Sequence, residues 1–264
     1  MGDWRVRVGA GVLALLAVVL LAQAIHDRSL YSRLLRTDGD LAVQNPKLVA
    51  FATDKGKAAF AAHCASCHGA EMKGDRTRGI ADLSDSDWLY GSGRVAEIEQ
   101  TILYGIRSGH PRAWNLATMP GFALPVPSTT YKTPPLTPSQ IHDIVEYVRL
   151  IGDKPADAAA AARGVKLYSN AGQCFDCHAN DGEGDAAIGA PDLVDDVWLY
   201  GDGSPQSLFN SIAHGHQGIC PSWTHRLPAG QIRALAVYLH THAAKAPPLA
   251  PIKAAAALKQ ENRS

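Results

Sequence analysis

The 264-residue sequence has no excess of charge, because 25 Lys and Arg residues balance 25 Asp and Glu residues. A protein that binds nucleic acid usually carries a basic face, so this composition gives no support for a nucleic-acid partner. Methionine is scarce and occurs only as Met1, Met72 and Met119. Cysteine occurs five times, and two short motifs use four of the five, so structural disulfides are not expected.

The two motifs are copies of Cys-x-x-Cys-His at residues 64–68 and 174–178. This pentapeptide is the attachment sequence of c-type haem, in which both thiols bond to the porphyrin and the histidine binds iron. A Cys-x-x-Cys alone could instead be a redox dithiol or half of a zinc site. Because the histidine recurs in both copies, the sequence predicts two covalently bound haem c groups. The predicted attachment and ligand residues are Cys64, Cys67, His68, Cys174, Cys177 and His178.

An apolar run lies near the N-terminus. Residues 8–22 contain no polar side chain, and the run extends to residue 25. As a helix it would span about 27 Å, close to the ~30 Å hydrocarbon core of a membrane. Arg5, Arg7 and the Ala22-Gln23-Ala24 sequence would also fit a cleaved secretory signal, but we expect a retained single-pass anchor. Since c-type haem is attached outside the cytoplasmic membrane, both interpretations place the remaining chain in the bacterial periplasm.

The two halves of the chain are similar at an offset of 110 residues. The sequence Trp-Leu-Tyr-Gly occurs at residues 88–91 and again at 198–201. A short helical pattern with glycine and an aromatic four residues apart precedes each haem motif, and an amphipathic helical pattern follows it. The sequence Thr137-Pro138 is a start signal for the first of these closing helices.

This order predicts an all-α fold, with an N-terminal transmembrane helix and two tandem class I cytochrome c domains. The glycine of each opening helix would allow close crossing by the closing helix of the same half. Tyr147 and Tyr238 are the candidate packing partners. The predicted division is an anchor and lead-in at 1–44, domains at 45–152 and 158–243, and a flexible tail at 244–264.

The sixth iron ligand is predicted to differ between the halves. Met119, in a Met-Pro-Gly-Phe sequence, is the candidate for the first haem, and His110 is its rival. In the second half, Cys220-Pro-Ser-Trp stands where Met119-Pro-Gly-Phe stands in the first, so the fifth cysteine falls on the ligand position. The alternatives for the second haem are His214, His216 or an open site. A thiolate ligand would lower the reduction potential of its haem.

The two tryptophans of the repeated Trp-Leu-Tyr-Gly sequence have two interpretations. The indole N–H groups of Trp88 and Trp198 could donate to haem propionates and so bind the cofactor. Plain packing of an aromatic turn would also account for them.

The loops around these motifs resemble those of a known family. Residues 78–91 and 104–110, with 189–201 and 233–240 in the second half, are similar to the di-haem subunit of cbb3-type cytochrome c oxidases, called CcoP or FixP. The resemblance covers about residues 45–242. It implies a membrane-anchored subunit that takes electrons from cytochrome c donors. The electrons would pass through a mono-haem c subunit to the catalytic haem–copper subunit, and the chain would do no oxygen chemistry itself.

The chain departs from the family pattern at two places. Only seven residues precede the apolar run, where family members usually carry an acidic and aromatic segment, and Cys220 replaces a methionine. Two alternatives therefore stay open beside the oxidase subunit. One is a free-standing membrane-bound di-haem carrier that serves a periplasmic dehydrogenase or another oxidase. The other is an enzyme or small-molecule sensor that uses a Cys-ligated haem.

Overall fold

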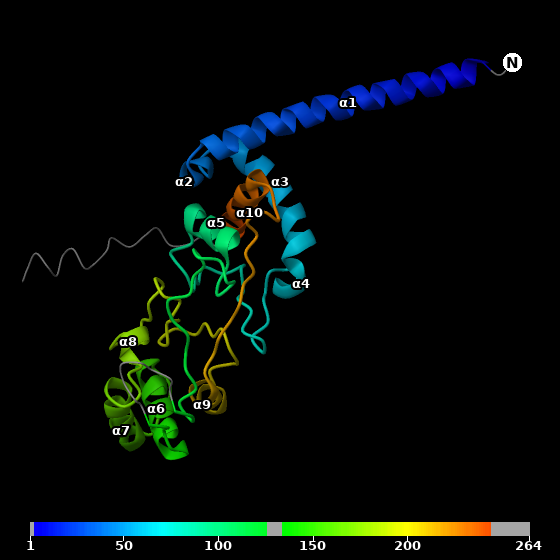
Figure 1. Ribbon diagram of the computed structural model, residues 1–264. Helices are drawn as coiled ribbons and strands as arrows, with labels where there is room; N and C mark the ends of the chain where they lie inside the picture. Colours follow the sequence, from blue (N-terminus) through cyan, green and yellow to red (C-terminus); the bar gives the residue numbers. More distant parts are fainter. Residues whose placement is uncertain (1–2, 126–133, 244–264) are drawn as a thin grey trace, which may run out of the picture.

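The computed structural model describes residues 3–125 and 134–243. In this part of the chain, helices are joined by loops with isolated β-bridges and no β-sheet, which confirms the predicted all-α class. A long helix, α1 (Asp3–Arg36), projects from a two-lobed body (Figure 1). The tail predicted at 244–264 lies outside the described residues.

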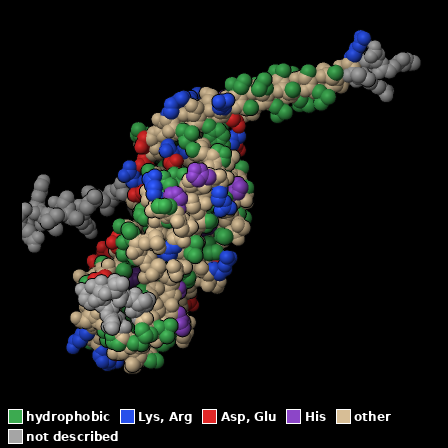
Figure 2. Space-filling model, viewed as in Figure 1, with side chains coloured by type: hydrophobic (Ala, Val, Ile, Leu, Met, Phe, Trp, Pro, Cys, Tyr) green, Lys and Arg blue, Asp and Glu red, His purple; other side chains and the backbone are tan. Residues whose placement is uncertain are grey.

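The projecting part of α1 carries the apolar run. Its large side chains are exposed and form an apolar surface along the projecting part of the helix (Figure 2). Among the described residues, this is the one helix long and apolar enough to cross a membrane. The last turns of α1 pack on the body instead, where Leu34 is fully buried and the ring of Tyr31 lies 4.8 Å from that of Phe51. The predicted anchor is therefore a continuous helix whose C-terminal end is fixed to the first lobe.

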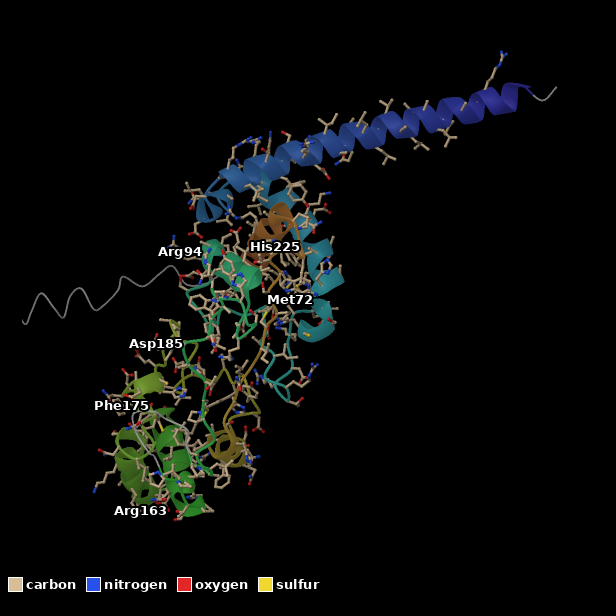
Figure 3. All side chains as sticks on the ribbon, viewed as in Figure 1. Met72, Arg94, Arg163, Phe175, Asp185 and His225 are labelled. Atoms are coloured by element: carbon tan, nitrogen blue, oxygen red, sulfur yellow. The ribbon has the colours of Figure 1, made fainter. Side chains whose placement is uncertain are left out.

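Lobe 1 lies next to α1 and holds the first Cys-x-x-Cys-His motif. Its helices are α2 (Gly39–Ala42), α3 (Pro46–His63), α4 (Ala65–His68), α5 (Val95–Tyr104) and α10 (Ala229–His242). Helix α10, from the far end of the chain, lies against α3 and α5 (Figure 1). The apolar face predicted for α10 is buried, and Met72 is buried in the same core (Figure 3). The buried α10 positions are Ile232, Leu235, Ala236 and Leu239.

Lobe 2 holds the second motif. Its helices are α6 (Pro138–Ile151), α7 (Ala158–Ser169), α8 (Phe175–His178) and α9 (Pro205–His214). The predicted start of α6 is confirmed, because Thr137 accepts from the Gln140 N–H at 3.3 Å and the Gln140 side chain accepts from the Thr137 N–H at 2.8 Å. The predicted apolar face of α6 is buried against α7 and α9. Its members are Ile141, Ile144, Val145 and Val148.

The lobes do not coincide with the two halves of the sequence. The predicted crossing of a glycine with a tyrosine occurs in both lobes, but its partners are exchanged: Gly56 of α3 packs on Tyr238, and Gly164 of α7 packs on Tyr147. Each opening helix thus uses the closing helix of the other half. Each lobe therefore combines helices from both of the predicted domains, 45–152 and 158–243.

The lengths of the connections account for the exchange. Only residues 152–157 join α6 to α7, and so short a connection makes two helices antiparallel neighbours. Helix α7 therefore packs on α6, the closing helix of the first half. Residues 105–125 leave α5 toward lobe 2, and residues 215–228 leave α9 toward lobe 1; we call these the two crossing segments. They run past each other between the lobes (Figure 1).

Candidate functional site

The first haem motif follows directly from the end of α3. Cys64 is the C-terminal cap of α3, with its N–H bonded to the Phe60 carbonyl at 2.8 Å, and the next four residues form the single turn α4. His68 ends this turn, and its Nδ1 lies 3.0 Å from the carbonyl oxygen of Ala81. That hydrogen bond fixes the tautomer and leaves Nε2 as the nitrogen available to a metal.

The second motif repeats this geometry in lobe 2. The motif forms the single turn α8, and Nδ1 of His178 lies 3.0 Å from the carbonyl oxygen of Pro191. Burial lowers the pKa of both His68 and His178, against the opposing effect of the carbonyl bond. Both imidazoles are thus neutral and oriented, which is the state in which histidine binds a metal.

Both motifs open into one cavity of about 680 Å³ between the lobes. Its lining includes both Cys-x-x-Cys-His motifs and the two sulfur candidates, Met119 and Cys220. Two pairs of cysteines, two oriented histidines and a shared hollow are what two covalently attached haems require. The residues present therefore fit the group that the sequence predicts.

Trp88 supplies an independent test of this fit. Its indole Nε1 is buried and, among the described residues, has no hydrogen-bond partner. Gly93, at φ +78°, packs so closely on this indole that a Cβ there would come within 2.2 Å of Nε1. A buried donor without an acceptor is costly, so an acceptor from outside the protein is expected at this position. Trp198 packs in the same way on Gly203, at φ +73°. Carboxylates of a haem would match both donors.

The sulfur candidates lie in the lobes opposite to those predicted. Met119 and Cys174 both pack against the core of lobe 2, while Cys220 lies near Cys64 and Cys67 in lobe 1. The sequence predicts Met119 for the first motif and Cys220 for the second, whereas the structure places Met119 in the lobe of the second motif and Cys220 in the lobe of the first. The exchange of closing helices is the physical reason, because each candidate precedes the closing helix that crosses to the other lobe.

The aromatic residue that follows each sulfur candidate lies in the same lobe as that sulfur. Phe122, three residues after Met119, is buried in the core of lobe 2. Trp223, three residues after Cys220, packs against the core of lobe 1, with its ring 5.3 Å from that of His63. Each ligand loop is thus held by its own aromatic side chain in the lobe where its sulfur lies.

The histidines that are alternative candidates for the sixth ligand either contact other side chains or are exposed. Nε2 of His216 lies 2.9 Å from the Ser211 hydroxyl, and its ring stacks on Tyr200. His214 ends α9 and is exposed. The ring of His110 stacks on Tyr104 at 4.7 Å. These contacts favour the sulfur side chains as the distal candidates.

The three cysteines of lobe 1 differ in exposure, because Cys67 is exposed whereas Cys64 and Cys220 are partly buried. Burial raises the pKa of Cys64 and of Cys220 to about 11, with a smaller contribution from neighbouring cysteines. In the absence of a metal the Cys220 side chain is therefore a thiol at neutral pH. Binding to iron removes the proton of a coordinating thiol, so the ligand form would be the thiolate.

Three residues that line the cavity have no role in the sequence predictions. The tyrosines of the repeated Trp-Leu-Tyr-Gly sequence reach across the interface: Tyr200 packs on Gly79 of the first half, and Tyr90 packs on Gly189 of the second. Arg107 belongs to the first crossing segment, and its guanidinium donates to a carbonyl in each of the two segments. The one sequence signal for Arg107 is that its position in the repeat is occupied by Gln217 in the second half.

Comparison with known proteins gives matches over both halves of the chain. Residues 159–239 match the family model described as cytochrome C oxidase, cbb3-type, subunit III, and residues 53–151 match that of cytochrome c. A cbb3-type cytochrome c oxidase subunit FixP from Bradyrhizobium sp. (strain ORS 278) is 38% identical over 199 residues, which cover 75% of this chain and 63% of that protein.

Two further relatives give the same picture. FixP from Azorhizobium caulinodans is 39% identical over 199 residues, covering 75% of this chain and 62% of that protein. CcoP from Cereibacter sphaeroides is 34% identical over 219 residues, covering 83% of this chain and 71% of that protein. The chain thus spans less than two thirds of the length of the two FixP relatives.

Proposed function

Because the chain belongs to the family of CcoP and FixP subunits of cbb3-type cytochrome c oxidases, we propose that it is a membrane-anchored electron-transfer protein. It would carry two covalently bound c-type haems and pass electrons toward the oxygen-reducing centre of a terminal oxidase. The observation that supports this proposal most directly is the cavity into which both motifs open, with the half-buried His68 and the buried His178 each held through Nδ1. Bound haem supplies the one-electron chemistry, through the change of its iron between Fe(III) and Fe(II).

The proximal side of each site is held by residues close in sequence. Cys64 and Cys67 at the first site, and Cys174 and Cys177 at the second, would hold the group through thioether bonds. The carbonyl oxygens of Ala81 and Pro191 accept from the Nδ1–H of the two histidines and hold each ring in its orientation.

The distal side of each site is completed by the other half of the chain. Cys220 would help His68 to hold the group attached at the first motif, and Met119 would help His178 to hold the group attached at the second. The location of each sulfur in the corresponding lobe supports this pairing. A thiolate carries negative charge and stabilises Fe(III), so the lobe 1 site would have the lower reduction potential. Trp88 and Trp198 would donate to the carboxylates of the bound group.

The remaining parts of the proposal concern location and partners. Helix α1 would span the cytoplasmic membrane once, with both lobes in the periplasm, where c-type haem is attached. Its C-terminal turns pack on lobe 1, which supports a fixed distance between this lobe and the membrane. The partners would be the mono-haem c and catalytic haem–copper subunits of the oxidase, with cytochrome c as electron donor.

The test is a purification of the tagged full chain from its native membrane in mild detergent. Intact mass should give two haems per chain, and the reduced-minus-oxidised spectrum should show c-type haem together with b-type haem from copurified subunits. Oxygen uptake with reduced cytochrome c should follow the same fractions. A protein without covalent haem would overturn the proposal. Two c-type haems without b-type haem or oxygen uptake would instead identify a free-standing carrier.

A control variant separates haem attachment from complex assembly. Replacing Cys174 and Cys177 with alanine should leave one covalent haem per chain. The α1 segment and lobe 1 attachment residues are unchanged in this variant. Loss of both haems would contradict independent attachment at the two motifs.

A further inference from the structure

Arg107 connects the two crossing segments through its side chain. Its Nε donates to the carbonyl of Gly218 at 2.5 Å, and Nη1 donates to the carbonyl of Ala117 at 2.9 Å. Nη1 also lies 3.2 Å from the hydroxyl of Tyr90. One guanidinium thus holds one carbonyl in each crossing segment, and hydrogen bonds from a charged donor are stronger than those between neutral groups.

The two carbonyls have equivalent places in the repeat. Ala117 is two residues before Met119, and Gly218 is two residues before Cys220. Both distal candidates therefore follow directly from a peptide that Arg107 binds. If the guanidinium moved, the carbonyls that it binds would move with it. Only two residues of backbone separate each carbonyl from a distal candidate.

The backbone around Arg107 fixes the position from which its side chain acts. The neighbouring Ile106 exchanges two hydrogen bonds with Cys220, at 2.9 and 3.0 Å, and the Arg107 N–H bonds to the Trp114 carbonyl at 2.8 Å. Arg107 has a φ of +47°, in the left-handed region that residues other than glycine rarely occupy. Such a backbone conformation persists where surrounding contacts hold it, and here those contacts belong to both crossing segments.

The repeat supplies only one such residue. The position equivalent to Arg107 in the second half is Gln217, which is exposed. On the other side of the pseudo-symmetric arrangement, the His216 N–H bonds to the Met119 carbonyl at 2.9 Å, and Gln217 supplies no charge there. Both ligand loops therefore depend on the same side chain.

We propose that Arg107 is a positioning residue for both haem sites, which holds the Cys220 loop and the Met119 loop in place together. This rests on the ligand pairs proposed above. Loss of the guanidinium would remove one charge-assisted hydrogen bond from each loop and make each sixth ligand easier to displace. The effect would be parallel at the two irons, although their ligands differ in chemistry and come from different halves of the chain.

The experiment uses the full chain in detergent and three variants, Arg107→Gln, Arg107→Lys and Gln217→Ala. Carbon monoxide binding to the reduced protein is counted per covalent haem. Electron paramagnetic resonance of the oxidised protein follows the thiolate-ligated and thioether-ligated irons as separate low-spin signals. For Arg107→Gln we expect carbon monoxide binding to become about tenfold faster at both sites, as loss of one such hydrogen bond per loop implies.

Arg107→Lys keeps the charge but not the planar fork that reaches two carbonyls, so its rates should lie between those of wild type and Arg107→Gln. If Arg107→Gln does not accumulate with two haems, the carbon monoxide rates of Arg107→Lys test the proposal in its place. Gln217→Ala should bind carbon monoxide as wild type does. Wild-type rates in the Arg107 variants, a change at one iron only, or an equal change in Gln217→Ala would overturn the proposal. A wild-type protein without the two expected low-spin signals would overturn the ligand pairs themselves.

Discussion

Gly56 of α3 lies directly against Tyr238 of α10, so that a Cβ at position 56 would come within 2.4 Å of the tyrosine Cβ and 2.5 Å of the Ala234 carbonyl oxygen. The two residues belong to different halves of the sequence repeat. Their contact closes the core of lobe 1, which also carries the first haem motif. The first haem site therefore depends on a helix near the C-terminal end of the described chain.

Gly56→Ala should for this reason lower the stability of lobe 1. The added methyl group meets backbone, which cannot rotate away, so we expect a loss of about 2–3 kcal/mol in the free energy of unfolding. Thermal unfolding followed by haem absorbance in detergent would measure it. Gly9→Ala is the matched control, because nothing lies within 4 Å of a Cβ at that position. Equal melting temperatures for the two variants would contradict the close crossing.

Local features of this fold could be predicted from the sequence. The helix start at Thr137-Pro138 and the apolar faces of α6 and α10 follow from capping chemistry and helical periodicity, and the structure has all three. The attachment residues follow from the spacing of cysteines and histidine. Each of these signals lies within a few residues of sequence, where the chain itself determines the geometry.

The partners of the helices could not be predicted in the same way. Because the halves are repeats, Gly56 presents a surface that either Tyr147 or Tyr238 could cover, and local sequence does not distinguish them. The short connection at 152–157 determines which helices pair, because it makes α6 and α7 neighbours. Helix α3 then packs on α10. The exchange of Met119 and Cys220 follows from that one constraint. The role of Arg107 could not be predicted either, because the one signal in the sequence is that Gln217 occupies the equivalent position in the second half.

Trp88→Phe tests whether the buried indole donates to a bound group. If Nε1 had no acceptor, removal of its N–H would be neutral or stabilising, because an unpaired buried donor costs about 1–3 kcal/mol. We expect a loss of about 1.5–3 kcal/mol instead, as for a hydrogen bond to a charged acceptor. Trp114→Phe is the reference for the same change in ring size combined with loss of a neutral hydrogen bond, since its Nε1 donates to the Thr101 hydroxyl at 2.9 Å. The measurement is chemical unfolding of the haem-loaded protein, and a stabilised Trp88→Phe would contradict the assignment.

Asp87 gives the protein a pH-dependent stability. Burial raises its pKa to about 6, with further contributions from Asp195, Asp85 and Asp192. The folded state therefore binds more protons than the unfolded state between about pH 4 and pH 6, and stability falls as pH rises through this window. Asp87→Asn should raise the free energy of unfolding above pH 6, which thermal unfolding would show as a higher melting temperature. The gain should be under about 1 kcal/mol, because the residue as a whole stays exposed and solvent screens its partly desolvated carboxylate. The gain should vanish near pH 4. A gain that is constant with pH would contradict this origin.

The exchange of distal ligands has a decisive test in proteins that carry one haem. With Cys174 and Cys177 replaced by alanine, only the lobe 1 site is loaded. Adding Cys220→Ala should then open the iron to carbon monoxide, whereas adding Met119→Ala should not, because Met119 packs in lobe 2.

With Cys64 and Cys67 replaced instead, the two results should reverse. In the lobe 1 background, Cys220→Met should also raise the midpoint potential by roughly 0.2 V or more, since axial ligands set haem potentials over a range of about 0.8 V. Opening by Met119→Ala in the lobe 1 background would show that each half binds its own haem with its own sulfur. The connection at 152–157 would then not determine the pairing, and the exchange of α6 and α10 between the lobes would have to be abandoned with it.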